Sequence, residues 1–266
     1  MAQTPATIIY IPHGGGPMPL LGDPAHHGLI EFLQTLHRRF PRPDAILIIS
    51  AHWEERVPTI TGGERPSLFY DYYGFPEEAY RIHYPAPGAP QLAAEIQKLL
   101  HDSGVQAALD TGRGYDHGMF VPLKLMYPEA DIACVQLSLL ASLDAAAHIA
   151  LGEALSALRH RNLLIMGSGM SFHNLRSFFL PGRDDNENFH RWLIDTCADP
   201  RLTREARRER LINWQAAPSA LACHPRPEHL LPLHVCFGMA GKDAATAEVV
   251  FNQAVMDRAV AGFLWR

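Results

Sequence analysis

The hydrophobic pattern of the chain alternates between two kinds of segment. Segments of the first kind are apolar, often β-branched runs that end at a polar residue or a glycine; they span residues 6–12, 45–51, 131–138 and 162–169. Segments of the second kind repeat apolar residues every three or four positions, as one face of a helix does; they span residues 29–39, 90–101, 144–160 and 186–198. This alternation predicts an α/β fold.

The apolar runs are nearly continuous, which is typical of strands covered on both faces in a parallel or mixed sheet. We therefore expect residues 1–266 to form a single catalytic domain with a mixed or largely parallel central sheet flanked by helices. Ligands of such sheets bind beyond the carboxyl ends of the strands. His13 and His52 follow two of the runs, and His173 follows a third at a short distance. The pattern predicts a site at this edge of the sheet.

Two further segments have a distinctive composition. Residues 69–90 are rich in aromatic residues and proline, which indicates a long ordered loop or short edge strands that shape a pocket. Residues 201–210 are strongly basic and predict a charged, solvent-facing helix rather than a nucleic-acid site.

Composition narrows the function classes. A chain of 266 residues with 47% hydrophobic and 19% charged residues is ordinary for a globular protein with a sizeable core. The net charge of −5 gives no reason to expect nucleic acid or a membrane as partner. No apolar run approaches the roughly 18 residues that span a bilayer. The start of the chain does not read as a secretory signal, and the four cysteines are scattered, so we expect a cytoplasmic protein without a disulfide framework.

The stretch PHGGGP, residues 12–17, invites two interpretations. Its glycine amides could form the oxyanion hole of a serine esterase, or His13 could bind a metal while the glycines turn the chain. An esterase also needs the elbow G-x-S-x-G, and no serine of this chain has glycine on both sides at that spacing. The nearest, Ser171, has His173 in place of the second glycine. The sequence therefore favours a metal ligand.

The chain contains fifteen histidines, and six of them stand in distinctive settings: His13, His52, His117, His173, His224 and His229. Neutral imidazoles that converge without cysteine ligands favour Fe(II) or Zn(II). Three protein ligands would leave positions open for substrate, and a further histidine could move protons. Pro227 indicates that a helix opens at residues 228–230. The remaining histidines are expected to be structural, with His26 and His27 as a surface pair at a helix start, in a loop that could reach the site.

Six motifs in order along the chain carry a family resemblance: PHGGGP, SAHW, YGFPEEAY with HYPAPGAP, GYDHGMFVPLKLMYPEADIACVQLS, GSGMSFHNLR and HPRPEHLLPL. With them the chain resembles the class III (LigB-type) extradiol ring-cleavage dioxygenases, in particular the DOPA 4,5-dioxygenase branch. The resemblance implies that His13, His52 and His229 bind the metal. It implies that His173 is an acid/base, or a fourth ligand to zinc, and that His117 contacts the bound diol or oxygen.

The resemblance also implies a reaction and its participants. These are a small catechol-type, DOPA-like diol, O₂, and one mononuclear metal, Fe(II) for activity with Zn(II) as the alternative, and no organic cofactor. Trp53, Tyr115, Gly15 and Gly16 are candidates for substrate binding, with Phe75 as a further aromatic candidate for the pocket wall. Family members usually read H-G-S-P, so the HGGGP of this chain is expected to reshape that wall. Two alternatives stay open, a zinc hydrolase on the same scaffold and a non-catalytic metal-binding homologue.

Overall fold

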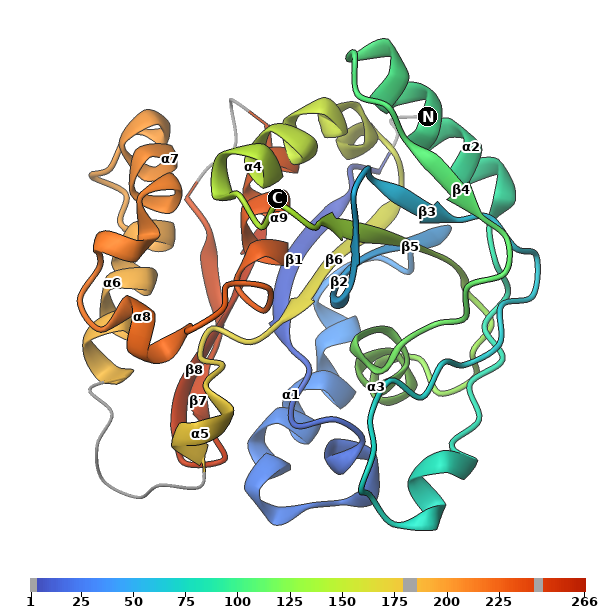
Figure 1. Cartoon of the computed structure of the whole chain (residues 1–266), viewed down its shortest axis with the longest axis horizontal. Helices are drawn as coiled ribbons and strands as arrows, with labels where there is room; N and C mark the ends of the chain where they lie inside the picture. Colours follow the sequence, from blue (N-terminus) through green and yellow to red (C-terminus); the bar gives the residue numbers. More distant parts are fainter. Residues whose placement is uncertain (1–3, 179–185, 242–245) are drawn as a thin grey trace.

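The computed structural model of the chain describes residues 4–178, 186–241 and 246–266. Within them, eight strands form a sheet in the order β4-β3-β5-β2-β6-β1-β8-β7 (Figure 1). Their bounds are β1 Thr7–Pro12, β2 Ala45–Glu55, β3 Thr59–Thr61, β4 Ala108–Asp110, β5 Ala133–Leu140, β6 Leu163–Gly169, β7 Glu248–Val255 and β8 Arg258–Trp265.

The centre of the sheet is parallel. Strand β1 pairs with β6, β6 with β2 and β2 with β5, all in the same direction, while β8 runs antiparallel to β1. Every residue of β1 and of β6 is buried, as the continuous apolar runs require. The expected mixed, largely parallel sheet flanked by helices is confirmed. Its parallel strands bring the carboxyl ends of β1, β2 and β6 to one edge.

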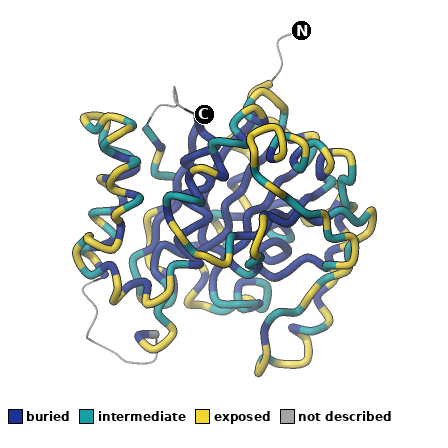
Figure 2. Tube along the Cα trace, turned by 45° about the horizontal axis from the view of Figure 1, so that its top comes forward, coloured by how far each residue is buried: buried dark blue, intermediate teal, exposed yellow. Residues whose placement is uncertain are grey.

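Helices cover the sheet on both faces, and the buried residues run through the centre of the molecule (Figure 2). Within the described part of the chain the α-helices are α1 His27–Leu36, α2 Pro90–Asp102, α3 His117–Met126, α4 Ala145–Ala154, α5 Leu175–Phe178, α6 Asn186–Ala198, α7 Arg204–Ile212, α8 Ala220–Cys223 and α9 Leu231–Met239. None of these is long and apolar enough to cross a membrane.

Helices α4 and α9 pack closely because each has a glycine at the contact. A Cβ on Gly152 would lie 2.1 Å from the carbonyl oxygen of Val235, and one on Gly238 would lie 2.2 Å from that of Ile149. Neither position has room for a side chain. This contact holds α9 against the sheet, and the segment just before α9 carries His229.

Three boundaries differ from the sequence-based expectation. Strand β2 continues to Glu55 after its pairing with β6 ends at Ser50, so His52 lies inside the strand rather than after it. The helix expected at residues 228–230 begins at Leu231, because residues 228–230 form a turn. The helix expected at residues 144–160 divides into α4 and a 3₁₀ segment, Ser156–His160.

The hairpin of β7 and β8 has no counterpart in the sequence-based prediction. Strand β7 lies at the edge of the sheet, and most of its residues are exposed or half-buried, so its apolar pattern is weak. The hairpin matters for the site because its tip, Met256 and Asp257, reaches the edge where the parallel strands end.

Candidate metal centre

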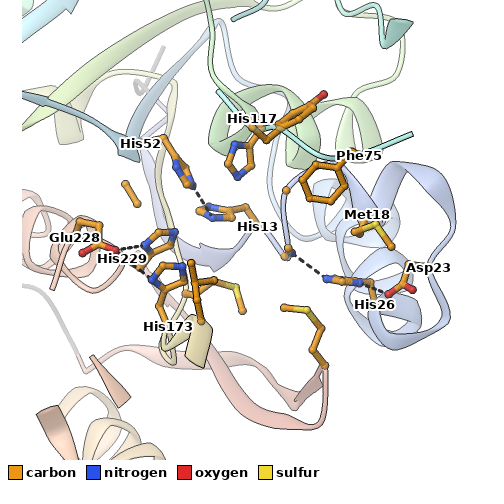
Figure 3. Close-up of a pocket in the computed structure, with 18 of the residues that line it drawn as sticks. His13, Met18, Asp23, His26, His52, Phe75, His117, His173, Glu228 and His229 are labelled. Atoms are coloured by element: carbon orange, nitrogen blue, oxygen red, sulfur yellow. Dashed lines mark hydrogen bonds and ion pairs between the residues drawn. The ribbon is translucent and has the colours of Figure 1, made fainter. Parts of the chain in front are cut away.

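Five histidines converge at the carboxyl edge of the central strands (Figure 3). His13 directly follows β1, and its N–H donates to the carbonyl of Gly169 at the end of β6, 3.1 Å away. His52 comes from the extension of β2, and His117 is the first residue of α3. His173 follows β6, and His229 lies in the turn before α9. The expected site at this edge is therefore built by residues more than 200 positions apart.

Three of the rings are nearly equidistant. The ring centroids of His13, His52 and His229 are 4.9 Å (His13–His52), 5.2 Å (His13–His229) and 4.9 Å (His52–His229) apart. The Nε2 atoms of His13 and His52 are 3.2 Å apart, a separation that suits two nitrogens bound to one ion at about 2.0–2.1 Å. The other two histidines break this symmetry, because His117 lies 3.9 Å from His52 and His173 lies 3.4 Å from His229.

Ligand atoms also form two groups by proximity among the described residues. Those of His13, His52 and His117 lie within 4.8 Å of one another, and those of His173, Glu228 and His229 do so too. The two groups face each other across the same cavity, so this edge of the sheet offers more nitrogen donors than three ligands require. The donor set fits a borderline divalent ion such as Fe(II) or Zn(II).

A hydroxyl fixes the tautomer of His13. Its Nδ1 lies 2.9 Å from Ser168 Oγ, and the Ser168 hydroxyl donates its own proton to the carbonyl of Gly118 at 2.5 Å. Since that hydroxyl has one proton, it accepts from His13 Nδ1–H. The lone pair of His13 is therefore on Nε2, which points toward His52. Such outer hydrogen bonds orient metal-binding imidazoles in proteins.

Two carboxylates lie beside Nδ1 of the other four rings. Asp71 lies 2.9 Å through each oxygen from Nδ1 of His117 and 3.4 Å from Nδ1 of His52. Glu228 lies 2.9 Å from Nδ1 of His229 and 3.1 Å from Nδ1 of His173. In all five rings Nδ1 faces the outer partner, and Nε2 is left for the centre of the cavity.

Burial and neighbouring charge set the protonation of the site. Desolvation by burial, followed by the adjacent imidazoles, lowers the pKa of His13 and His229 well below its usual value, and the pKa of His52 is lowered in the same way despite Asp71 nearby. Burial would raise the pKa of Asp71 and Glu228, but hydrogen bonds from His117 and His173 outweigh it and lower both. The lowered pKa values favour neutral imidazoles at His13, His52 and His229, beside the ionised carboxylates of Asp71 and Glu228.

Sequence reasoning missed Asp71 and Ser168 altogether and noticed Glu228 only as part of a helix start. Asp71 comes from the aromatic loop expected to shape a pocket, so its position there was a usable signal. Ser168 is an internal residue of a buried strand, where a lone hydroxyl carries no pattern. Glu228 directly precedes His229, and that adjacency was the visible sign of a carboxylate–histidine pair.

The histidines line one end of a cleft of about 1100 Å³. Gly15, Gly16 and Phe75 line it as expected. Trp53 and Tyr115 do not, and their assignment to the pocket is corrected. Trp53 is buried, with its Nε1–H on Glu55, and the Tyr115 hydroxyl donates to the carbonyl of Cys134 at 2.7 Å inside the core.

The expectation of a surface pair at His26 and His27 is wrong for His26. Its side chain is 1% exposed and lines the cleft. The N–H of Gly15 donates to His26 Nε2 at 2.9 Å, so His26 Nδ1 carries the proton and donates to Asp23 at 2.6 Å. The pair ties the glycine turn after His13 to the start of α1. His224 is buried away from the cleft, with Nε2 3.0 Å from the carbonyl of Ser171.

Comparison with known proteins shows which family and relatives this chain resembles. A family model described as the catalytic LigB subunit of aromatic ring-opening dioxygenase matches residues 5–263. The dioxygenase tasH of Hapsidospora irregularis is 42% identical over 90% of this chain and 79% of its own length. A 4,5-DOPA dioxygenase extradiol of Mirabilis jalapa is 37% identical over 89% of this chain and 88% of its own length. The 4,5-DOPA dioxygenase extradiol of Escherichia coli K12 is 35% identical over 90% of this chain and 86% of its own length.

A solved structure shares the fold over nearly its whole length. The crystal structure of an uncharacterised protein from Escherichia coli K12 matches with a TM-score of 0.76 and 29% identity. The match covers 98% of this chain and 99% of that one.

Proposed function

The chain belongs to the LigB family of aromatic ring-opening dioxygenases and is an extradiol ring-opening enzyme. We propose that its substrate is a catechol-type diol, DOPA-like in its two adjacent ring hydroxyls, and that its metal is Fe(II). Enzymes of this family use one mononuclear metal. We take residues 1–266 as a single catalytic domain. The observation that carries the proposal is the arrangement of His13, His52 and His229, two buried rings and one half-buried ring at nearly equal separations.

These three histidines would hold the ion, each oriented by an outer partner: Ser168, Asp71 and Glu228 in turn. When bound, a ferrous ion supplies adjacent coordination positions for the diol and O₂ and passes electron density between them. Both atoms of O₂ enter the product as the C–C bond beside the diol breaks.

His117 and His173 would handle the protons. Both line the cleft beside the proposed ligands, and neither fits the near-equal spacing of the three ligand rings. The Nδ1 of His117 is hydrogen-bonded to Asp71, so its Nε2 is free to accept a proton from a diol hydroxyl. Asp71 would then stabilise the imidazolium, as a buried carboxylate does for a general base. His173 stands in the same relation to Glu228 and would return a proton during ring opening.

The alternatives of a zinc hydrolase and of a non-catalytic homologue gain no support, since the named relatives are dioxygenases. Zn(II) is the alternative metal for the same ligands. We further propose a cytoplasmic location, which is favoured by four buried cysteines of which none forms a disulfide. The proposed partners are the diol and O₂, without nucleic acid or membrane.

Anaerobic reconstitution tests the proposal. Protein freed of metal is loaded with Fe(II) and, in parallel, with Zn(II), and each form is mixed with catechol or DOPA in air-saturated buffer. The Fe(II) form should consume one O₂ per diol and form a yellow ring-opened semialdehyde, followed with an oxygen electrode and by absorbance. Failure of the Fe(II) form to turn over any member of a broad catechol panel would refute the proposed substrate class.

A further inference from the structure

We propose that the diol opened here has the adjacent ring hydroxyls of DOPA but carries, in place of the amino-acid side chain of DOPA, a bulky apolar substituent, alkyl or aryl, without a carboxylate. This inference rests on the proposed opening of catechols and adds to it the part of the substrate that the ring chemistry leaves open. It is carried by three features of the cleft: its size, its apolar wall and the pairing of its charges.

The cleft is much larger than a catechol ring. It has a volume of about 1100 Å³, whereas a cavity of roughly 150 Å³ is enough to hold benzene. Figure 3 shows the five converging histidines toward one end of the cleft. Met18, Phe75 and His26 lie on the opposite side of His13 from Glu228. A ring held at the histidines therefore leaves most of the cleft for its substituent.

Part of the wall facing the five converging histidines is apolar, and the glycine turn shapes this part. Met18, Phe75 and Met256 line it. A Cβ on Gly15 would come within 3.2 Å of Met256 Sδ, and one on Gly16 within 3.1 Å of Phe75 Cζ. The two glycines thus let a thioether and an aromatic ring close over the turn. Methionine adapts to irregular apolar ligands and contacts aromatic rings favourably.

Met256 is held in the wall by a strained turn. It occupies the tip of the β7–β8 hairpin with φ of 49°, and the next residue, Asp257, has φ of 60°. Two-residue hairpin turns of this kind prefer Asn-Gly, so a methionine in the left-handed region is costly. The Met256 N–H donates to the carbonyl of Ala25 at 3.1 Å, which anchors the tip beside the glycine turn.

The charges of the cleft disfavour a carboxylate. Four carboxylates line it, those of Asp23, Glu54, Glu228 and Asp257, and Arg226 is the one guanidinium among the described lining residues. The two terminal nitrogens of Arg226 donate to the two oxygens of Glu54 at 2.6 Å each, and one lies 3.4 Å from Glu228. A carboxylate on the substrate would meet a cation that is already paired, with like charges beside it.

Three probes test this with the Fe(II)-loaded full chain: catechol, 4-butylcatechol and 3-(3,4-dihydroxyphenyl)propionate. The last two have side chains of similar length that differ in the carboxylate. Burial of apolar surface strengthens transition-state binding by a factor of about four per methylene. We expect kcat/KM for 4-butylcatechol to exceed that of catechol and that of the propionate by about tenfold or more.

Two variants locate the preference. Met256→Asn places a residue that tolerates a positive φ at the hairpin tip, so Tm should not fall. Its kcat/KM should fall several-fold for 4-butylcatechol and much less for catechol. Glu54→Gln keeps the shape of the side chain but weakens its hold on Arg226, and should raise the ratio of propionate to 4-butylcatechol turnover several-fold. Leu109→Ala, on the distant edge strand β4 and 40% exposed, is the control and should leave all ratios unchanged.

The outcomes separate the two proposals. Turnover of all three probes with equal kcat/KM, or a preference for the propionate, overturns the apolar substituent while leaving ring opening intact. Equal losses on all probes in Met256→Asn would show that this residue is structural and would remove the apolar wall from the inference. Absence of turnover for every probe would refute the proposed function itself.

Discussion

Two groups of buried histidines in this protein differ in the use of their second ring nitrogen. His148, in α4, is fully buried, and both of its nitrogens meet the backbone: Nδ1 lies 2.7 Å from the carbonyl of Asp144, and Nε2 accepts from the N–H of Leu140 at 3.1 Å. His13 is equally buried and also has a partner for Nδ1, but its Nε2 faces the Nε2 of His52. Only the second arrangement leaves lone pairs for a metal.

Burial and basicity therefore do not identify the site. Burial lowers the pKa of His148 to about 4, and it also lowers the pKa of His13. What distinguishes the site is that its nitrogens converge while their outer partners are a hydroxyl and two carboxylates. A core histidine stabilises its helix cap or strand, whereas a site histidine has one atom reserved for something outside the protein.

The largest expected effect comes from replacing one histidine of each group by alanine. His52→Ala should lose metal and turnover completely, a larger effect than the roughly 10–100-fold cost of losing an outer partner, with little change in the Tm of the metal-free protein. His148→Ala should do the opposite, retaining metal while losing about 2–4 kcal/mol of stability, because it leaves a cavity and unpaired backbone groups. Metal analysis, O₂ uptake and chemical denaturation measure the three quantities. If His52→Ala kept its metal, the proposed ligand set would be wrong.

A second change tests the division of roles inside the site. His117→Ala should keep the metal and lower kcat by about 10²–10⁴, the range typical of a lost general base. His173→Ala, its counterpart on the Glu228 side, serves as the comparison and should also retain metal if Fe(II) has three protein ligands. Metal content and O₂ uptake are measured together on each variant. Loss of metal in His117→Ala would move that residue into the ligand set, where its proximity to His13 and His52 also allows it.

The core histidine also predicts a pH dependence of stability. Because burial lowers the pKa of His148 from its usual 6.5 to about 4, the folded state binds fewer protons than the unfolded state between these values. The contribution of neutral His148 to the free energy of unfolding is complete above pH 6.5 and is lost as the pH falls toward 4. It amounts to about 3 kcal/mol. Urea unfolding of the metal-free protein at pH 7, 6, 5 and 4 measures it against His148→Gln. The variant should lose less stability over this interval, and parallel curves would contradict the assignment.

The sequence predicted the parts of the fold and site in which a histidine follows a recognisable apolar strand. Continuous apolar runs placed the central strands, and His13 and His173 after β1 and β6 predicted an edge that the structure confirms as the meeting point of these elements. His26 could not be placed, because a histidine at a helix start reads as solvent-exposed until Gly15 and Asp23 are folded onto it. Trp53 and Tyr115 were misplaced for the converse reason. An aromatic residue beside a site motif looks the same whether it turns to the cleft or to the core.

The smallest expected effect concerns one hydroxyl group, that of Ser168 beside His13. Ser168→Ala removes the hydroxyl that accepts a hydrogen bond from His13 Nδ1–H. The buried Nδ1–H of His13 then has no partner. Metal affinity should fall by about 10–100-fold, as is usual for an outer partner, with turnover recovering at saturating Fe(II). Ser138→Ala is a matched control, a buried serine of β5 whose hydroxyl accepts from the N–H of Thr59 at 3.0 Å. It should cost a similar amount of stability and no metal affinity. Equal Fe(II) titration curves for the two variants would mean that the tautomer of His13 does not depend on Ser168, and the distinction between site and core histidines would then rest on convergence alone.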